Sequence, residues 1–297
     1  MKKVKRLLVF LVVIALLQGL ALLFLTPGGL EKVFVLPFRL KVEKFKPDTN
    51  IYAVYYDMRS DIAKADVIVV GMDFSVAESY DVLGHFTRFL KQNSDLSAVL
   101  MPFDKRQTAL SNELLGAQDE SEIVPRFEAL TAEGNLSADC ADYIGEIYRI
   151  NATMIEAKKF GFLSYSESTG EVPLPKRIAA AAHRTDRSVL CVVDILEMKD
   201  SAAFREELEA VLGGRKVLTL GMYYDSSSAS AETHEAVSFP FAGEVPACYF
   251  VKNRDHESFY RYYRFVTKHL SAGKKVPLDR RFTDYFFIIT GGTGIKT

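Results

Sequence analysis

The first apolar pattern of the chain is continuous and lies at its N-terminus. Residues 7–30 carry no charge, and Leu7–Leu25 is almost wholly apolar. As a helix rising about 1.5 Å per residue, this run spans roughly 28 Å, close to the hydrocarbon thickness of a bilayer. The pattern predicts a single transmembrane anchor over residues 7–26.

A cleaved signal peptide and a buried core helix are the alternatives for this run. A signal peptide usually has a shorter apolar stretch and a cleavage site of small residues, whereas this run ends in Leu25-Thr26-Pro27-Gly28-Gly29. The preceding tail, residues 1–6, contains four positive charges, which favours a cytoplasmic N-terminus. We therefore expect a single-pass protein of the cell membrane with an extracytoplasmic domain.

Behind the anchor, the pattern changes to short apolar runs and amphipathic stretches. Apolar and basic positions alternate over Glu31–Asp48, which predicts a stalk or an edge strand within residues 27–50. A β-branched run at Asp66–Gly71, an amphipathic stretch at Ala77–Gln92 and a second short run at Ala98–Met101 form a strand–helix–strand unit with parallel strands. Residues 188–221 repeat this unit.

The remaining elements complete one domain over residues 51–290. The further predicted elements are helices near Gln107–Leu115, Glu122–Ala132, Ala138–Phe160 and Asp255–Leu270, a last strand at Tyr285–Thr290, and a flexible tail at 291–297. Alternating strands and helices are typical of a single α/β domain with a largely parallel sheet flanked by helices.

Charge and cysteine content narrow the classes of partner. The net charge is −1, and the domain without its basic tail carries about −5, which argues against a nucleic-acid-binding surface. The three cysteines, Cys140, Cys191 and Cys248, exclude a framework in which every cysteine is paired, although a Cys140–Cys248 bridge stays open. The expected partners are the membrane and either an envelope protein or a small-molecule ligand.

Polar residues follow the ends of the predicted parallel strands. Ligands of open parallel sheets gather at these carboxyl ends. The candidates are Asp73, Ser75, Asp104, Asp194 and Glu197 for catalysis, and Tyr223, Tyr224 and Asp225 for ligand binding. Asp73, Asp104 and Asp194 could together bind a divalent cation or carry out acid–base chemistry. The alternative is that each aspartate caps a helix or stabilises a turn.

The order of these motifs resembles a known superfamily. A strand, glycine and polar loop at Val67–Ser75, a second strand ending in Pro102-Phe103, and a helix with Asn112 and Leu114 resemble the erythromycin esterases and the ChaN-like (Tiki-related) haem-uptake proteins. Further similarity lies at Lys176–Ala180, Phe204–Gly221 and Phe282–Ile288. The resemblance implies an α/β fold and, in the family, ester hydrolysis.

This chain departs from the family at the catalytic positions. Where the family has a glutamate and a histidine after the first strand, the chain has Asp73-Phe74-Ser75, and Met101 replaces a glutamate at the end of the second strand. Residues 194–197 lack the histidine of the family's third turn, and methionine, phenylalanine and leucine cannot exchange a proton in its place. Arg177 alone carries over from the family, either as a ligand-binding residue or as a salt-bridge partner on a helix surface.

Three functions are therefore consistent with the sequence. The first is a membrane-anchored binding or interaction module with a vacated esterase-like site. The second is a hydrolase that uses strand-end carboxylates and a divalent metal. The third is capture of haem or another flat hydrophobic ligand, with Tyr223, Tyr224 or a histidine as axial ligand.

Overall fold

The structure is a computed structural model that describes residues 43–45, 58–166, 172–198, 201–224, 247–252 and 283–295. The predicted anchor, most of the predicted stalk and the predicted helix at Asp255–Leu270 lie outside these ranges. Within them, no helix combines the length and the apolar character needed to cross a membrane.

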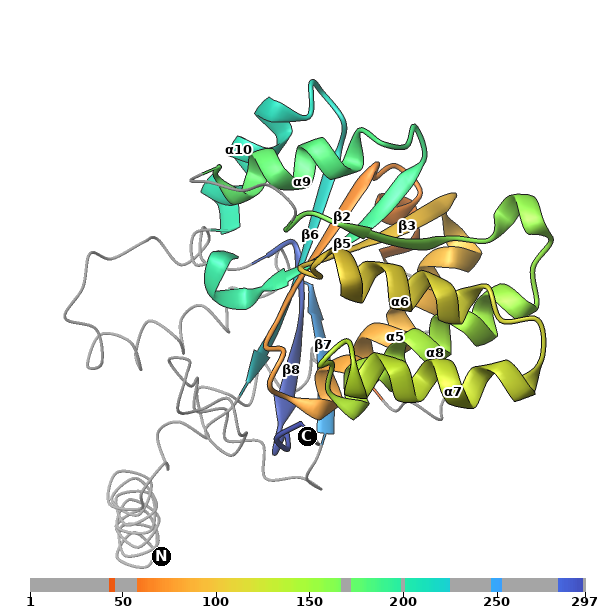
Figure 1. Cartoon of the computed structure of the whole chain (residues 1–297). Coiled ribbons are helices and arrows are strands. Elements are labelled where there is room, and N and C mark those ends of the chain that lie inside the picture. Colours follow the sequence, from red (N-terminus) through yellow and green to blue (C-terminus); the bar gives the residue numbers. More distant parts are fainter. Residues whose placement is uncertain are drawn as a thin grey trace, which may run out of the picture.

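In the described part of the chain, eight strands form one mixed sheet (Figure 1). The strands are β1 (Glu43–Phe45), β2 (Val67–Met72), β3 (Leu96–Met101), β4 (Gly161–Ser164), β5 (Ser188–Asp194), β6 (Val217–Tyr224), β7 (Ala247–Lys252) and β8 (Tyr285–Thr290). Their spatial order is β1-β7-β8-β6-β2-β5-β3-β4. Every neighbouring pair from β8 to β4 is parallel, and β7 is antiparallel to β8 and β1. The predicted α/β domain with a largely parallel sheet is confirmed.

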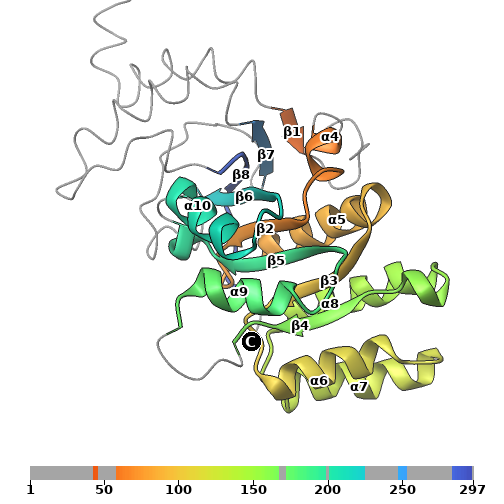
Figure 2. The same ribbon diagram turned by 90° about the horizontal axis from the view of Figure 1, so that it is seen from above.

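Helices cover both faces of the sheet (Figure 2). They are α4 (Arg59–Ile62), α5 (Ala77–Asn93), α6 (Lys105–Leu115), α7 (Glu120–Ala132), α8 (Ala138–Ala152), α9 (Leu174–Ala182) and α10 (Ser201–Val211). Helices α5 and α8 pack together on one face, and α9 and α10 pack together on the other. Helix α6 packs against α7, α8 and the edge strand β4.

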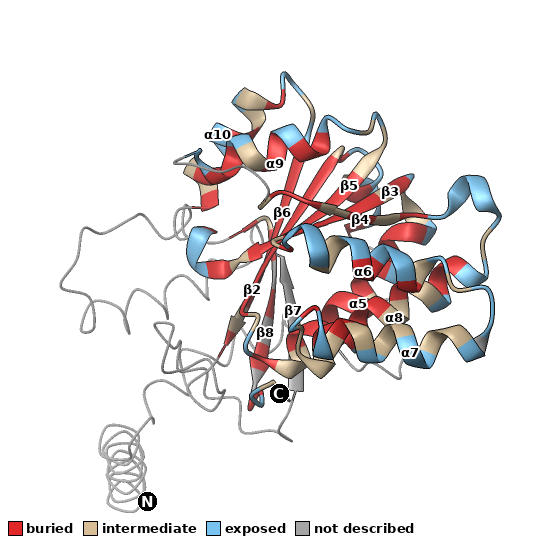
Figure 3. Ribbon diagram, viewed as in Figure 1, coloured by how far each residue is buried: buried red, intermediate tan, exposed pale blue. Residues whose placement is uncertain are grey.

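The core lies along the central strands (Figure 3). All six residues of β2 are buried, as are the five residues Val189–Val193 of β5. A parallel strand with helices on both faces has no solvent-facing side, which explains why these strands are continuous apolar runs rather than alternating ones. Their hydrophobic burial is the main force that holds the sheet in place.

Two asparagine side chains cover the outer edge of β4. Asn112 on α6 donates from Nδ2 to the carbonyl of Phe162 (3.0 Å) and accepts the Phe162 N–H at Oδ1 (2.9 Å). Asn151 on α8 makes the same pair of bonds to Phe160, at 2.7 and 3.1 Å. Gly161 lies between them, and a Cβ there would approach Asn112 Oδ1 to 2.7 Å. Both asparagines therefore stand where a neighbouring strand would pair.

Two predicted elements differ from the structure. The single helix predicted over Ala138–Phe160 ends at Ala152, and a short 3₁₀ turn at Glu156–Lys158 leads into β4. The reason is the buried Asn151 side chain, because its bonds to Phe160 fold the chain back after the helix. Residues 291–295, within the predicted flexible tail, bond to the loop between β2 and α5.

Candidate functional site

The carboxyl ends of β2, β5 and β6 meet at one edge of the sheet, which we call the strand-end site. The parallel register pairs Met72 of β2 with Asp194 of β5, and β6 lies on the other side of β2. Asp73 therefore leaves the sheet next to the exit of β5. As the sequence predicted, the polar residues that follow these strands are brought to a common edge.

Asp73 and Ser75 form a compact loop directly after β2. The side chain of Asp73 is buried, and its Oδ1 accepts the backbone N–H (2.7 Å) and the hydroxyl (2.6 Å) of Ser75. The hydroxyl of Tyr224, at the end of β6, accepts the N–H of Asp73 at 2.8 Å and lies 2.7 Å from the hydroxyl of Ser79. The loop is therefore fixed from inside the protein by a tyrosine that is distant in sequence.

Asp104 has a local structural role. It is the N-cap of α6: its Oδ1 accepts the N–H of Gln107 at 2.7 Å, and the Gln107 side chain accepts the N–H of Asp104 at 3.0 Å. This reciprocal pair is a capping box, which satisfies two backbone donors at the start of a helix. The capping interpretation therefore accounts for Asp104 without a ligand.

Asp194 and Glu197 lie in a tight turn after β5. Asp194 Oδ1 accepts the N–H of Leu196 at 2.8 Å, and Glu197 is exposed within the 3₁₀ turn Ile195–Met198. Over the part of the chain that the structure describes, no three His, Cys, Asp or Glu side chains are grouped so that they could hold a metal ion. The predicted set of Asp73, Asp104 and Asp194 is therefore not brought together as a metal centre.

Arg177 lies beside Tyr165, close to the strand-end site. The centre of its guanidinium group is 5.9 Å from the centroid of the Tyr165 ring. The Tyr165 hydroxyl donates to the carbonyl of Val192 at 2.8 Å. Burial raises the pKa of Tyr165, with smaller contributions in the same direction from nearby groups that include Glu197 and Asp194, so the phenol stays neutral. Arg177 Nε is buried and makes no hydrogen bond to any described residue.

The two tyrosines at the end of β6 differ in their surroundings. Tyr224 is buried and bonded to the Asp73 loop, whereas Tyr223 is half-buried. The Tyr223 ring lies over Gly221, where a Cβ would approach its Cε2 atom to 2.6 Å. Asp225, the third residue predicted here, lies outside the described residues.

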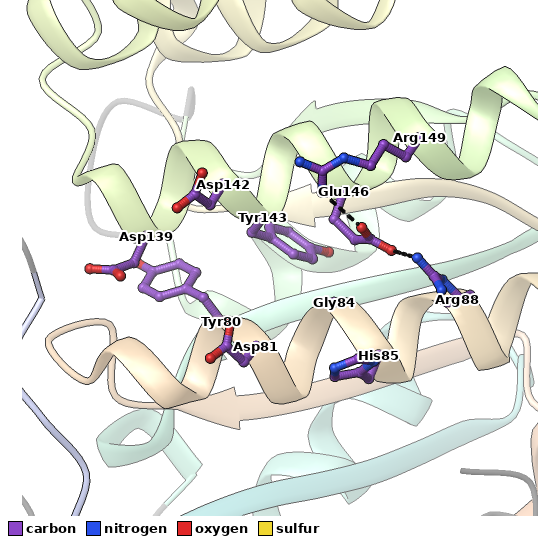
Figure 4. Close-up of a pocket in the computed structure, with 10 residues that line it drawn as sticks. All are labelled: Tyr80, Asp81, Gly84, His85, Arg88, Asp139, Asp142, Tyr143, Glu146 and Arg149. Atoms are coloured by element: carbon purple, nitrogen blue, oxygen red, sulfur yellow. Dashed lines mark hydrogen bonds and ion pairs between the residues drawn. The ribbon is translucent and has the colours of Figure 1, made fainter. Parts of the chain in front are cut away.

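A hollow that the sequence did not reveal lies between α5 and α8 (Figure 4). Its volume is about 290 Å³, and we call it the α5–α8 groove. Its lining residues are Tyr80, Asp81, Gly84, His85, Arg88, Asp139, Asp142, Tyr143, Glu146 and Arg149. At one end, Glu146 pairs with both Arg88 and Arg149. The other end carries three aspartates.

The acidic end of the α5–α8 groove affects the ionisation of Asp81. Partial burial raises the pKa of Asp81, and the carboxylates of Glu78, Asp139 and Asp142 raise it further, against the opposing effect of His85. The sequence signal for this groove is the spacing of charged residues on two helices. Finding it requires knowing that α5 and α8 pack together.

Comparison with known proteins identifies the fold alone. No protein-family model and no curated protein matches the sequence. Among solved structures, a protein from Bacillus cereus is similar with a TM-score of 0.56 and 8% identity, over 89% of this chain and 98% of that one. A succinoglycan biosynthesis protein is similar with a TM-score of 0.54 and 11% identity, over 91% of this chain and 100% of that one. Both likenesses extend over most of this α/β chain.

Proposed function

We propose that this chain is a membrane-anchored, extracytoplasmic α/β domain that binds an anionic ligand at the strand-end site. The apolar run at 7–26 and the basic tail before it support the anchor and its orientation. The convergence of strand ends at one edge of a parallel sheet supports the location of the site. In this proposal the domain is a binding or interaction module with a vacated esterase-like site.

The observation that carries the ligand class is the buried, unbonded Nε of Arg177. A buried N–H donor without an acceptor costs free energy. We therefore infer that its acceptor is a ligand, which is not among the described residues. A guanidinium group offers a rigid planar set of donors that matches a carboxylate or a phosphate. Its position over the Tyr165 ring restrains the orientation of that plane.

The residues available at this edge support binding better than ester hydrolysis. Ser75 donates its hydroxyl to Asp73, and among the described residues no histidine is hydrogen-bonded to it as it would be in a serine–histidine pair. At the positions where the resembled superfamily carries its glutamate and histidines, this chain has Asp73, Met101 and residues 194–197. The proposal therefore keeps the family resemblance and assigns the chain no esterase chemistry.

The other two functions have less support. A metal-dependent hydrolase needs carboxylates that converge, whereas Asp104 caps α6 and Asp194 accepts a bond within its own turn. Haem ligation by Tyr224 would need its hydroxyl, which is bonded to the Asp73 loop. A haem titration of the purified chain also tests Tyr223 and the histidines as ligands, and under the binding proposal it should give no Soret shift.

The proposal is tested by ligand-induced stabilisation of the full chain in detergent, with inorganic phosphate and benzoate as probes. A ligand that binds only the folded state raises the free energy of unfolding, by about 1.4 kcal/mol at ten times its dissociation constant. We expect a concentration-dependent rise in melting temperature with at least one probe. Arg177→Gln should abolish the rise, and Arg177→Lys should weaken it because the planar fork is lost.

The matched control is Lys176→Gln, which removes a positive charge from the adjacent, exposed position of α9. It should leave the probe-induced shift intact. An equal loss in Lys176→Gln and Arg177→Gln would mean that the probes respond to general charge, and no shift with either anion in the wild-type chain would overturn the proposal.

A further inference from the structure

Residues 291–295 continue from β8 and lie against the loop between β2 and α5. The N–H of Ala77 donates to the carbonyl of Thr293, and the N–H of Ile295 donates to the carbonyl of Ser75, both at 3.0 Å. Between these bonds, Val76 and Gly294 form an antiparallel bridge. The segment therefore lies against the loop that carries Asp73 and Ser75, at the β2 end of the strand-end site.

One side-chain pair fastens this segment to α5. The Glu78 carboxylate accepts the backbone N–H of Thr293 at 2.7 Å and its hydroxyl at 2.8 Å. Both residues of this pair are accessible to solvent, and Thr293 and Gly294 are exposed. The first N–H of α5 has no side-chain cap and is satisfied by the segment instead.

The same loop is held in two different ways on its two sides. On the inside, the buried Tyr224 hydroxyl bonds to Asp73 and Ser79, where water cannot compete. On the outside, the bonds to Thr293 are exposed, so water can replace each of them when the segment lifts. Gly291, at a φ of 62°, adopts a conformation that favours glycine, where the segment leaves β8.

We propose that residues 291–295 form a releasable strap that holds the β2–α5 loop closed and gates ligand entry to the strand-end site. The gating role rests on the proposed function, whereas the release of the strap does not. Ile295, which packs on the core, anchors the segment, and the Glu78–Thr293 pair is its latch. Opening of the latch frees the N–H of Ala77 in the first turn of α5, while the bond from Ile295 to the Ser75 carbonyl stays with the anchor.

Hydrogen exchange of the full chain, read by mass spectrometry, measures the release. Thr293→Val removes the hydroxyl bond of the latch and keeps the backbone N–H, and Glu78→Gln removes the charge at similar size. Either variant should speed amide exchange in residues 74–79 and 291–295 about tenfold, since exposed local openings are the most easily populated. Glu128→Gln and Thr131→Val on α7 are the matched controls and should leave both segments at the wild-type rate.

Thiol labelling measures access beneath the strap. Ser79→Cys places a thiol at a fully buried position in the first turn of α5, so modification by a maleimide requires that turn to open. In a chain that also carries Thr293→Val, labelling of this thiol should accelerate several-fold over Ser79→Cys alone. Unchanged exchange in both latch variants, or unchanged labelling despite faster exchange, would overturn the gate.

A reversible lock provides the opposite perturbation. Val76 and Gly294 are directly opposed in the bridge, and a Cβ added at Gly294 meets nothing within 4 Å. In a Val76→Cys/Gly294→Cys chain, oxidation should slow exchange of residues 74–79 and abolish phosphate-induced stabilisation, and reductant should restore both. If oxidation slows exchange but phosphate does not stabilise the chain in either state, the strap is supported and the proposed anionic ligand is wrong.

Discussion

The hydroxyl of Tyr224 accepts the backbone N–H of Asp73 at 2.8 Å, across 151 positions of sequence. This bond joins the last residue of β6 to the first residue after β2, at the edge where both strands end. The same hydroxyl lies 2.7 Å from the Ser79 hydroxyl in the first turn of α5. One phenol therefore fixes a strand end and a helix start together.

Replacement of Tyr224 by phenylalanine should destabilise the fold by about 1–3 kcal/mol, because a buried N–H and a buried hydroxyl lose their partner. Urea unfolding of the two chains measures this difference. Tyr148→Phe, on the half-buried face of α8, is the control and should cost less than about 0.5 kcal/mol. Equal losses in the two variants would mean that Tyr224 contributes no more than a peripheral hydroxyl.

Gly71 in β2 should not accept a side chain. An added Cβ would lie 2.7 Å from Met198 Sδ and 2.8 Å from Ile195 Cδ1, so Gly71→Ala forces these two buried side chains to repack and should cost about 1–3 kcal/mol. Gly145→Ala on α8 is the converse control, because nothing lies within 4 Å of its added Cβ. It should stabilise the chain by about 0.5–1 kcal/mol through helix propensity. Thermal unfolding distinguishes the two signs.

The capping role of Asp104 has its own test. Asp104→Ala should cost about 1 kcal/mol, while Asp104→Asn, which can still accept the Gln107 N–H, should stay within a few tenths. Chemical denaturation of both variants measures the difference. If Asp104→Asn instead removed metal-dependent stabilisation without changing the stability of the metal-free chain, Asp104 would be a ligand rather than a cap.

The α5–α8 groove should make stability depend on pH. Burial and the carboxylates of Glu78, Asp139 and Asp142 raise the pKa of Asp81 in the folded chain, so folding favours its protonated form. This contribution to stability is fully present below the unfolded pKa of about 3.9 and is lost as the pH rises through the raised folded pKa. Near pH 7, Asp81→Asn should therefore be more stable than the wild type.

The test is the difference in stability between Asp81→Asn and the wild type as a function of pH. The advantage of Asp81→Asn should shrink as the pH falls towards 4, in melting curves recorded at matched ionic strength. Its size should be modest, because Asp81 is only partly buried and is therefore screened by solvent. Glu128→Gln, exposed on α7, should show no such trend, and an advantage independent of pH would point to helix propensity instead.

The sequence predicts the central strands and helices well, because buried apolar residues recur with the period of the element that contains them. The six buried residues of β2 are a β-branched run that ends at a glycine and a methionine, and α5 follows with a clear apolar face. Strand β4 was hidden, since four residues after a helix carry too short a pattern. Strand β4 is defined by its pairing with β3 and by the bonds of Asn112 and Asn151 to its outer edge, all of which are tertiary contacts.

The site was predicted in outline and not in detail. The strand ends do place Asp73 and Asp194 at one edge, as parallel topology requires. Each carboxylate accepts a hydrogen bond from a nearby backbone N–H, that of Ser75 for Asp73 and that of Leu196 for Asp194. The sequence pattern alone does not show whether such a carboxylate bonds to its own turn or to a ligand. The unbonded Nε of Arg177 is likewise visible only in three dimensions.

The hydrogen bonds of Asn112 and Asn151 to the edge of β4 affect how the protein behaves at high concentration. An open sheet edge is a template on which another chain can add a strand, and it leads to aggregation. Here the N–H and carbonyl groups of Phe160 and Phe162 are already bonded to Asn151 and Asn112. The two side chains make the hydrogen bonds that a neighbouring strand would make. They therefore block the addition of a strand from another chain at these residues of the β4 edge, a role that charged residues or prolines have at other sheet edges.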